Sequence, residues 1–350
     1  MSLVLQVDGD RWREHLRRTT VSNPGLVPVI KGNGYGLGLP RLLAEAARLS
    51  GEGQVREVAI GSYAEAPLAL SAHPGDVLVM EPYRAAVPPL PGAAELALGD
   101  PTLIHTVTTA DDARHLTSRA GRVRVVVEGL TSMNRFGVRL DEVARLRADL
   151  ADLPLDVEAM TLHLPLGEGH LDEVSRWVEA VDEPRWFVSH VSPSELSTLR
   201  SRHPDRTFRP RIGTSLWLGD PGALTVRAHV LDVRRVDKGD RAGYRQRALR
   251  AGTLVVVSGG TAHGIALEGP SAAATPRQRA IAVTEGVMQA AHRVRSPFAI
   301  DGRPTWFAEP PHMQVSLLSL PADVTPPAIG DQLTVRVRHT TLRADAVDIT

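Results

Sequence analysis

The chain has 350 residues, of which 43% are hydrophobic and 23% are charged. This length and composition suit a globular protein with one large domain or two ordinary ones. Lysine and arginine together total 40, as do aspartate and glutamate, so the net charge is zero. Because basic residues are not concentrated in any run, we expect neither nucleic acid nor an anionic membrane as a partner.

The sequence contains no cysteine. This absence excludes disulfides, thiolate metal sites and cysteine nucleophiles, and we predict no metal site. No apolar stretch approaches the roughly 20 residues that a membrane span requires. The opening residues, MSLVLQVDGDRW, lack the basic region and long apolar core of a signal peptide. We therefore expect a cytoplasmic protein.

The first informative stretch is 26–38, LVPVIKGNGYGLG. Its apolar residues up to Ile30 predict a buried strand, which delivers Lys31 at its carboxyl end into a glycine-rich turn. A helix is expected from Pro40, because proline is favoured in a first helical turn. Its predicted buried face consists of Leu42, Leu43, Ala46 and Leu49.

Lys31 and Lys238 are the only lysines in the chain. A buried amine is costly to desolvate unless it is paired or used chemically. Arginine supplies positive charge elsewhere, so Lys31 predicts an amine that can lose its proton, such as one that forms a Schiff base. The alternative is a lysine whose amine simply reaches solvent at a loop, which is how we interpret Lys238 in the turn VDKGD.

Strand-like and helical segments alternate after this point. The predicted strands are 57–61, 76–80, 103–107, 122–128, 156–163, 186–190 and 207–211, and the predicted helices include 64–70, 111–117, 140–150, 171–181 and 193–200. Alternation of this kind is typical of parallel βα units. About eight units in roughly 200 residues favour a (β/α)₈ barrel, with a doubly wound sheet as the alternative.

The pattern changes after Pro221. Short β-rich runs are separated by Gly, Pro and Asp, which predicts a mainly-β domain. These runs are 224–236, 253–257, 314–320, 332–338 and 344–349, and residues 3–7 are expected to add a strand. We place the barrel at residues 8–221 and the β domain at residues 222–350 plus 1–7.

Polar side chains follow several of the predicted barrel strands. Because the carboxyl ends of barrel strands converge on one mouth, we expect these side chains to lie together. They are Lys31, Arg135, His163, His190 and Arg211. Ser194 is expected to cap the helix that follows, and the backbone of Gly213 and Thr214 offers N–H groups, which together predict an anion site.

The spacing Lys31-x-x-x-Tyr35-Gly36-x-Gly38 resembles the lysine motif of alanine racemases, which are fold type III enzymes that use pyridoxal phosphate (PLP). The similarity follows the family's order along nearly the whole chain. Further matches are Met133-x-Arg135-x-Gly137-Val138, His163, His190-x-x-x-Ser194, Arg211-x-Gly213, Gly239-x-x-x-Gly243-Tyr244 and His312-Met313-Gln314. The resemblance implies a TIM-type barrel followed by a mainly-β domain.

The resemblance also implies an activity, that of a PLP-dependent amino-acid racemase, which is an isomerase. Lys31 would bind PLP as a Schiff base and move a proton at one face of the amino acid. Tyr244, reaching in from the other subunit of a head-to-tail homodimer with shared active sites, would serve the opposite face. Arg135 and the backbone N–H of Met313 would orient the substrate carboxylate. The residues implied to hold PLP are Lys31, Tyr35, His163, His190, Ser194, Arg211, Gly213 and Thr214.

The chain departs from the family's pattern at positions that concern the substrate. Glu128 stands where many members carry a carbamylated lysine, and a glutamate can pair with Arg135 in the same way. His312 replaces the usual cysteine, and Gln314 an aspartate. The stretch 258–264, SGGTAHG, lacks the family's entrance residues, and no tyrosine follows Tyr244. We predict a wider and drier entrance, and an amino-acid substrate that need not be alanine.

Two other functions remain open. The chain could be a fold type III PLP enzyme of different chemistry, such as a decarboxylase, although the familiar decarboxylases of this fold are longer and use a cysteine. It could also be a non-catalytic PLP-binding or homeostasis protein, although these resemble the barrel alone. The β domain and Tyr244 favour the racemase.

Overall fold

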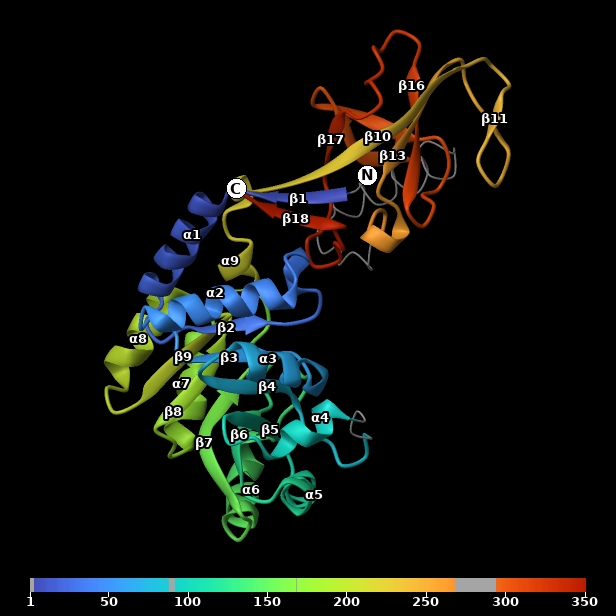
Figure 1. Ribbon diagram of the computed structural model, residues 1–350. Coiled ribbons are helices and arrows are strands. Elements are labelled where there is room, and N and C mark those ends of the chain that lie inside the picture. The colour runs from blue at the N-terminus through green and yellow to red at the C-terminus, as the bar shows by residue number, and fades with distance from the viewer. Residues whose placement is uncertain (1–2, 88–91, 168, 268–293) are drawn as a thin grey trace. The chain divides into compact units, whose positions relative to one another are not determined.

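The computed structural model describes residues 3–87, 92–167, 169–267 and 294–350. The chain divides into two compact units (Figure 1). The described parts of 13–34 and 38–219 form one, called here the barrel unit, and those of 1–12, 35–37 and 220–350 form the other, called the β unit. The domain boundaries expected after residues 7 and 221 stay a prediction.

The barrel unit contains a closed barrel of eight parallel strands. They are β2 (Val27–Ile30), β3 (Glu57–Ile60), β4 (Asp76–Pro82), β5 (Leu103–Val107), β6 (Val123–Gly129), β7 (Leu155–Leu162), β8 (Arg185–Ser189) and β9 (Thr207–Ile212). The last strand pairs with the first, with Val27 opposite Arg211, which closes the barrel. The predicted (β/α)₈ barrel is therefore confirmed, and the doubly wound sheet is excluded.

Helices connect the strands and lie around them (Figure 1). They are α1 (Gly9–Ser22), α2 (Leu39–Gly51), α3 (Ala66–Ala72), α4 (Ala93–Leu96), α5 (Ala110–Ala120), α6 (Val143–Ala151), α7 (Leu171–Ala180), α8 (Pro193–Arg202) and α9 (Thr214–Trp217). Helix α2 has Pro40 in its first turn and buries the predicted apolar face. None of the helices among the described residues has the length and apolar character needed to cross a membrane.

Alternation along the strands sorts the barrel side chains into two apolar cores. The inner core contains Val29 of β2, Val126 of β6 and Phe187 of β8, and the outer core packs residues such as Trp186 of β8 against helical side chains such as Trp177. Because successive side chains point to opposite faces of a strand, each strand is buried on both faces. Burial of this kind contributes about 1.5–3 kcal/mol for each large apolar side chain.

Charged side chains lie at the amino ends of the barrel strands. Glu57, at the start of β3, is only 1% exposed and pairs with Arg185 of β8 at 2.7 Å and with Arg209 of β9 at 3.1 Å. Glu57 is two residues before Ala59, and Arg185 is two residues before Phe187, so each charged residue lies on the same face of its strand as the apolar residue. Both apolar residues belong to the inner core. The apolar core therefore lies between these ion pairs and the carboxyl ends of the strands.

The β unit is built on an eight-stranded sheet in the order β13-β16-β15-β14-β17-β10-β1-β18, with β10 also pairing with β13. Its strands are β1 (Leu3–Val7), β10 (Leu224–Val236), β13 (Gly252–Ser258), β14 (Arg295–Ile300), β15 (Arg303–Phe307), β16 (Val315–Pro321), β17 (Gln332–Val335) and β18 (Ala346–Ile349), and a small hairpin pairs β11 (Arg241–Ala242) with β12 (Arg247–Ala248). The mainly-β character was predicted correctly, but β14, β15 and the hairpin were missed. Pro297 and Pro304 weaken the strand pattern of β14 and β15.

Candidate active site

Six polar residues named in the sequence analysis lie at the carboxyl ends of the barrel strands, close enough for their charges to interact. They are Lys31, Glu128, Arg135, His163, His190 and Arg211. Because side chains alternate between the two faces of a strand, four of these residues lie on the inner face of the barrel. They are Lys31 after β2, Glu128 of β6, His163 after β7 and Arg211 of β9. The charges of Arg135 and Arg211 act on the pKa of Lys31, Glu128, His163 and His190. The predicted convergence of these barrel residues is therefore present in the structure.

Lys31 is exposed to solvent as a residue, but protein atoms and charged groups surround its amine. The pKa of the amine lies below the usual lysine value, because surrounding atoms desolvate it and because Arg135 and Arg211 repel a further positive charge. The negative charge of Glu65 opposes this shift. A Cβ on Gly61 would lie 2.9 Å from the Cβ of Lys31, so glycine at 61 leaves room for the lysine stem. The result is an amine that loses its proton more readily than an ordinary lysine.

Glu65 holds the turn that contains Lys31, and it was missed from sequence. Its carboxylate accepts hydrogen bonds from the N–H groups of Gly32 at 2.7 Å, Gly61 at 2.6 Å and Ser62 at 3.2 Å. The pattern Ser62-x-x-Glu65 is a capping box at the start of a short 3₁₀ helix, Tyr63–Glu65. That local pattern is readable in the sequence, but it does not show that the same carboxylate also reaches the loop after β2.

The two predicted histidines contact each other edge to face. The ring centroids of His163 and His190 are 5.5 Å apart, and the Oγ of Ser189 lies 3.2 Å from Nδ1 of His163. Desolvation and then the charge of Arg211 lower the pKa of His163 to about 3. Desolvation, followed by the charge of His170, also lowers the pKa of His190. His163 is therefore neutral at physiological pH.

Arg211 is buried in the barrel, and a buried donor of its guanidinium is unpaired among the described residues. Its Nη2 donates to the carbonyl of Leu162 at 3.2 Å, whereas its Nε is buried and has no partner among the described residues. Desolvation lowers its pKa to about 10, so the guanidinium stays charged at neutral pH. A buried unpaired donor costs free energy, and the Nε of Arg211 could donate to a ligand atom that accepts a hydrogen bond.

Glu128 is a buried carboxylate that faces several cations. It is 3% exposed, its Oε2 has no hydrogen bond partner among the described residues, and the charges of Arg211, Arg135 and Arg84 act on it. Desolvation raises its pKa despite these cations. The carboxylate therefore partly balances the positive charge around Arg211 and Arg135.

Arg135 lies in a loop that neighbouring elements hold in place. The loop closes where the N–H of Leu130 donates to the carbonyl of Val138 at 2.8 Å. Ser132 donates from its N–H and its Oγ to the two carboxylate oxygens of Glu173 on α7, each at 2.6 Å. Gly137 has φ +129°, and a Cβ there would overlap the backbone of Leu130. The exposed Arg135 is therefore presented by a fixed loop.

The helix cap expected at Ser194 is instead Ser192. Helix α8 begins at Pro193, and the Oγ of Ser192 accepts from the N–H of Glu195 at 3.3 Å. Ser194 lies one residue into the helix, with its Oγ 3.1 Å from that of Ser192. The capping prediction was wrong by two residues because Pro193 is favoured at the first helical position and moves the cap before it. Gly213 precedes the four-residue α9, which begins at Thr214.

Three predicted site residues belong to the β unit. Tyr35 is buried with φ 55°, a left-handed conformation that is uncommon for tyrosine. Tyr244 is 85% exposed and Met313 is 72% exposed. The barrel residues are brought together by the structure, but a shared site of Lys31 with Tyr35, Tyr244 and Met313 stays a prediction.

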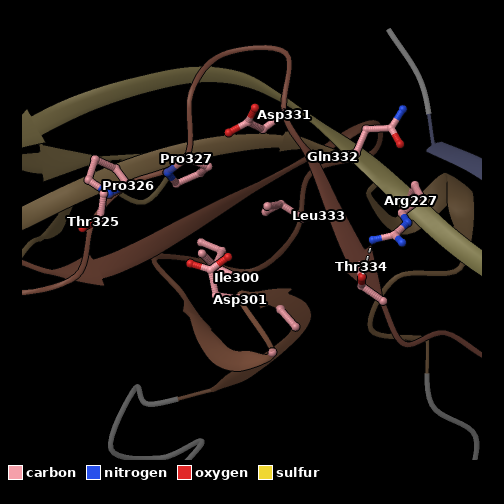
Figure 2. Close-up of a pocket in the computed structure, with 12 residues that line it drawn as sticks. Arg227, Ile300, Asp301, Thr325, Pro326, Pro327, Asp331, Gln332, Leu333 and Thr334 are labelled. Atoms are coloured by element: carbon pink, nitrogen blue, oxygen red, sulfur yellow. Dashed lines mark hydrogen bonds between the residues drawn. The ribbon is translucent and has the colours of Figure 1, made fainter.

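A cavity of about 490 Å³ lies within the β unit, and none of the predicted site residues lines it (Figure 2). It is lined by residues of β10, β14 and β17, and Arg227 donates to Oγ1 of Thr334 at 2.7 Å. We assign it no role. In the described part of the chain, no group of three or more His, Cys, Asp or Glu side chains could hold a metal ion.

Comparison with solved structures finds many alanine racemases of the same fold at low identity. The enzyme from E. faecalis is 15% identical with a TM-score of 0.69, covering 99% of this chain and 98% of that one. The enzyme from Bartonella henselae, described with covalently bound pyridoxal phosphate, is 17% identical with a TM-score of 0.67, covering 97% and 91%. A histidine racemase from Leuconostoc mesenteroides subsp. sake is 17% identical with a TM-score of 0.64, covering 97% and 90%.

At these low identities, the structural similarity establishes the fold alone. The family follows from a sequence profile. No curated protein sequence matched the chain. The profile described as "Alanine racemase, N-terminal domain" matches residues 7–221, which is more than half of the chain. This span includes Lys31, the Arg135 loop, both site histidines and Arg211. The protein therefore belongs to the alanine racemase N-terminal domain family, as a divergent member.

Proposed function

We propose that the protein is a PLP-dependent amino-acid racemase, an isomerase of the alanine racemase type. The observation that carries the proposal is Lys31, whose amine has a lowered pKa beside Arg135 and Arg211 at the carboxyl ends of the barrel strands. A neutral amine is the form that reacts with an aldehyde. An amine with a lowered pKa is also better suited than an ordinary lysine to take up and return a proton.

The barrel residues fit PLP. When bound, PLP supplies electron withdrawal from the α-carbon of an amino acid, which acidifies its proton. Lys31 would hold the aldehyde carbon, and the unpartnered Nε of Arg211 supplies a donor suited to a ring nitrogen. Arginine does not readily give up a proton, so it would leave that nitrogen unprotonated. His163, neutral and backed by His190, would pack against the ring, and Tyr35, Ser194, Gly213 and Thr214 would hold the phosphate.

The chain's own residues would divide the proton transfer between two faces of the amino acid. The amine of Lys31 would remove or deliver the α-proton on one face, and the phenol of Tyr244 from the other subunit of a head-to-tail homodimer would do so on the opposite face. Arg135 and the backbone N–H of Met313 would hold the substrate carboxylate. Glu128, one of the charges around Arg135, would support this orientation.

We further propose that the substrate range includes amino acids larger than alanine. The stretch 258–264 lacks the family's entrance residues, and no tyrosine follows Tyr244. A histidine racemase shares the fold, so the fold accommodates a larger substrate in at least that protein. The chain need not share that substrate.

The decisive experiment measures deuterium exchange at the α-carbon with a panel of amino acids in D₂O, followed by chiral analysis. We expect exchange with inversion, and borohydride should fix the cofactor on Lys31. Lys31→Ala should lose both the cofactor absorbance and the activity. Tyr244→Phe should keep the absorbance while exchange slows by about 10²–10⁴-fold. A colourless protein, or reductive labelling only at Lys238, would contradict the proposal.

A further inference from the structure

Within its own chain Tyr244 is highly exposed, so burial among the residues of that chain does not fix the direction of its side chain. It lies in the turn that joins β11 and β12, and its side chain is 85% exposed. An exposed tyrosine ordinarily samples several rotamers. An acid–base group, however, must be held within hydrogen bond reach of its proton. The structure must therefore restrain Tyr244 by contacts other than burial if it has the role proposed above.

A buried carboxylate lies directly behind this turn. Glu309, after β15, is 3% exposed, and its Oε1 accepts a hydrogen bond from the backbone N–H of Tyr244 at 3.2 Å. Gly243 has φ +74°, and a Cβ at this position would overlap the Glu309 carboxylate. Glycine is thus required before Tyr244 both by the backbone conformation and by the approach of the carboxylate.

The same carboxylate fixes an imidazole that contacts the tyrosine ring. Oε1 of Glu309 also accepts from Nε2 of His312, which sets the ring orientation and places a proton on Nε2. The rings of His312 and Tyr244 have centroids 4.4 Å apart with an angle of 45° between their planes. The backbone of His312 is itself held, since its N–H donates to Val315 at 2.9 Å and its carbonyl accepts from Thr261 at 2.8 Å.

We propose that Glu309 and His312 are positioning residues that hold Tyr244 in its working orientation. Glu309 anchors the backbone of Tyr244, and His312, fixed by Glu309, provides the surface on which the phenol ring rests. The inference rests on the proposed acid–base role of Tyr244 and adds to it the groups through which the chain restrains that residue. Neither Glu309 nor His312 is required to touch the substrate.

The test uses the holoenzyme with its tyrosines replaced by 3-fluorotyrosine, which gives fluorine resonances for four tyrosines. The resonance that disappears in Tyr244→Phe reports on Tyr244 alone. Glu309→Gln keeps the shape of the side chain but removes its charge, and His312→Gln still reaches Glu309 but removes the ring. In both variants we expect the Tyr244 resonance to move at least about halfway to its position in denatured protein, because His312→Gln removes the ring contact and Glu309→Gln weakens the hydrogen bonds that hold the Tyr244 backbone and the His312 ring.

Steady-state exchange kinetics provide the second measurement. Loss of orientation should lower kcat by about tenfold while KM changes by less than about twofold, because a positioning defect acts on the proton transfer and leaves binding unchanged. Gly243→Ala, which displaces the Glu309 carboxylate, should give the same spectral shift. Glu14→Gln, an exposed glutamate on α1, is the matched control and should leave the resonance and the kinetics unchanged.

The outcomes separate this inference from the proposed function. If Glu309→Gln and His312→Gln fold, retain the cofactor absorbance and leave the Tyr244 resonance unmoved, the positioning role is wrong whatever the activity. If the wild-type enzyme exchanges no amino-acid proton, the proposed function fails, yet the resonance still decides whether the pair restrains Tyr244. If Glu309→Gln does not fold, the His312→Gln variant alone tests the positioning role, because position 312 is only partly buried and the substitution is better tolerated there.

Discussion

A single amine in this protein has an environment different from that of an ordinary lysine. Lys31 follows the inner face of β2, and the two cations that lower its pKa, Arg135 and Arg211, are arginines. Desolvation and repulsion both favour the neutral amine. The negative charge of Glu65, which accepts hydrogen bonds from backbone N–H groups, reverses only part of the lowering of the pKa. The chemistry of Lys31 is therefore set by its neighbours.

The pH dependence of Lys31 labelling tests this environment. A lowered pKa means that the amine loses its proton at a lower pH than an ordinary lysine, so a larger neutral fraction remains as the pH falls toward neutrality. Competitive acetylation of cofactor-free protein against a free lysine analogue should show relative labelling of Lys31 that rises as the pH is lowered. Mass spectrometry can separate it from Lys238, the only other lysine. Relative labelling that stays constant or falls as the pH is lowered would show that the pKa is not lowered, and Arg135→Met should weaken the rise.

Loops at the barrel mouth are held by charged residues on the neighbouring helices. The segment between β6 and η4 (Leu140–Glu142) carries Arg135, and Glu173 of α7 binds it through two hydrogen bonds to Ser132. Hydrogen bonds to a carboxylate are typically stronger than those between neutral groups. The position of Arg135 thus depends on a helix that follows the next strand along the chain.

Glu173→Gln is expected to loosen the Arg135 loop. If Arg135 holds the substrate carboxylate, KM should rise by about tenfold, while kcat changes by less than about threefold, because the proton-transfer residues are untouched. Glu179→Gln lies on the exposed side of the same helix and serves as the control. Equal kinetics for the two variants would show that the loop does not depend on Glu173.

At the scale of the whole molecule, residues from both ends of the sequence share one sheet. β1 lies between β10, which it pairs with antiparallel, and β18, which it pairs with in parallel. Its side chains Leu3, Leu5 and Val7 are at most 1% exposed. The predicted contribution of residues 3–7 to the β domain is confirmed by this pairing. The β unit is therefore complete only when the first and last segments of the chain are both present.

Deletion of residues 1–7 should destabilise the β unit. It removes three buried apolar side chains, each worth about 1.5–3 kcal/mol, and it removes the strand with which β18 pairs. We expect rapid proteolysis within the last residues of the chain, detected by mass spectrometry of a timed digest. Leu5→Ala should have a smaller effect in the same direction, about 2–5 kcal/mol in chemical denaturation. Resistance of the C-terminal segment in the deletion variant would contradict this view of the sheet.

The sequence by itself determined the fold class and the group of side chains at the barrel mouth. The βα alternation and the polar residues that follow several strands are local patterns, and they correctly located Lys31, His163, His190 and Arg211 at the same end of the barrel. The sequence was less reliable where two local signals competed. Pro193 moved the helix cap to Ser192, and prolines hid β14 and β15.

Only the tertiary structure decided which carboxylates support the site residues. Glu65, Glu173 and Glu309 read in the sequence as ordinary polar residues, yet each binds a loop that carries a predicted functional residue. The partners of Glu173 and Glu309 lie 41 and 65 positions away along the chain. Periodicity and spacing record the preferences of neighbouring residues, whereas a contact between distant segments depends on the closed barrel and the assembled sheet.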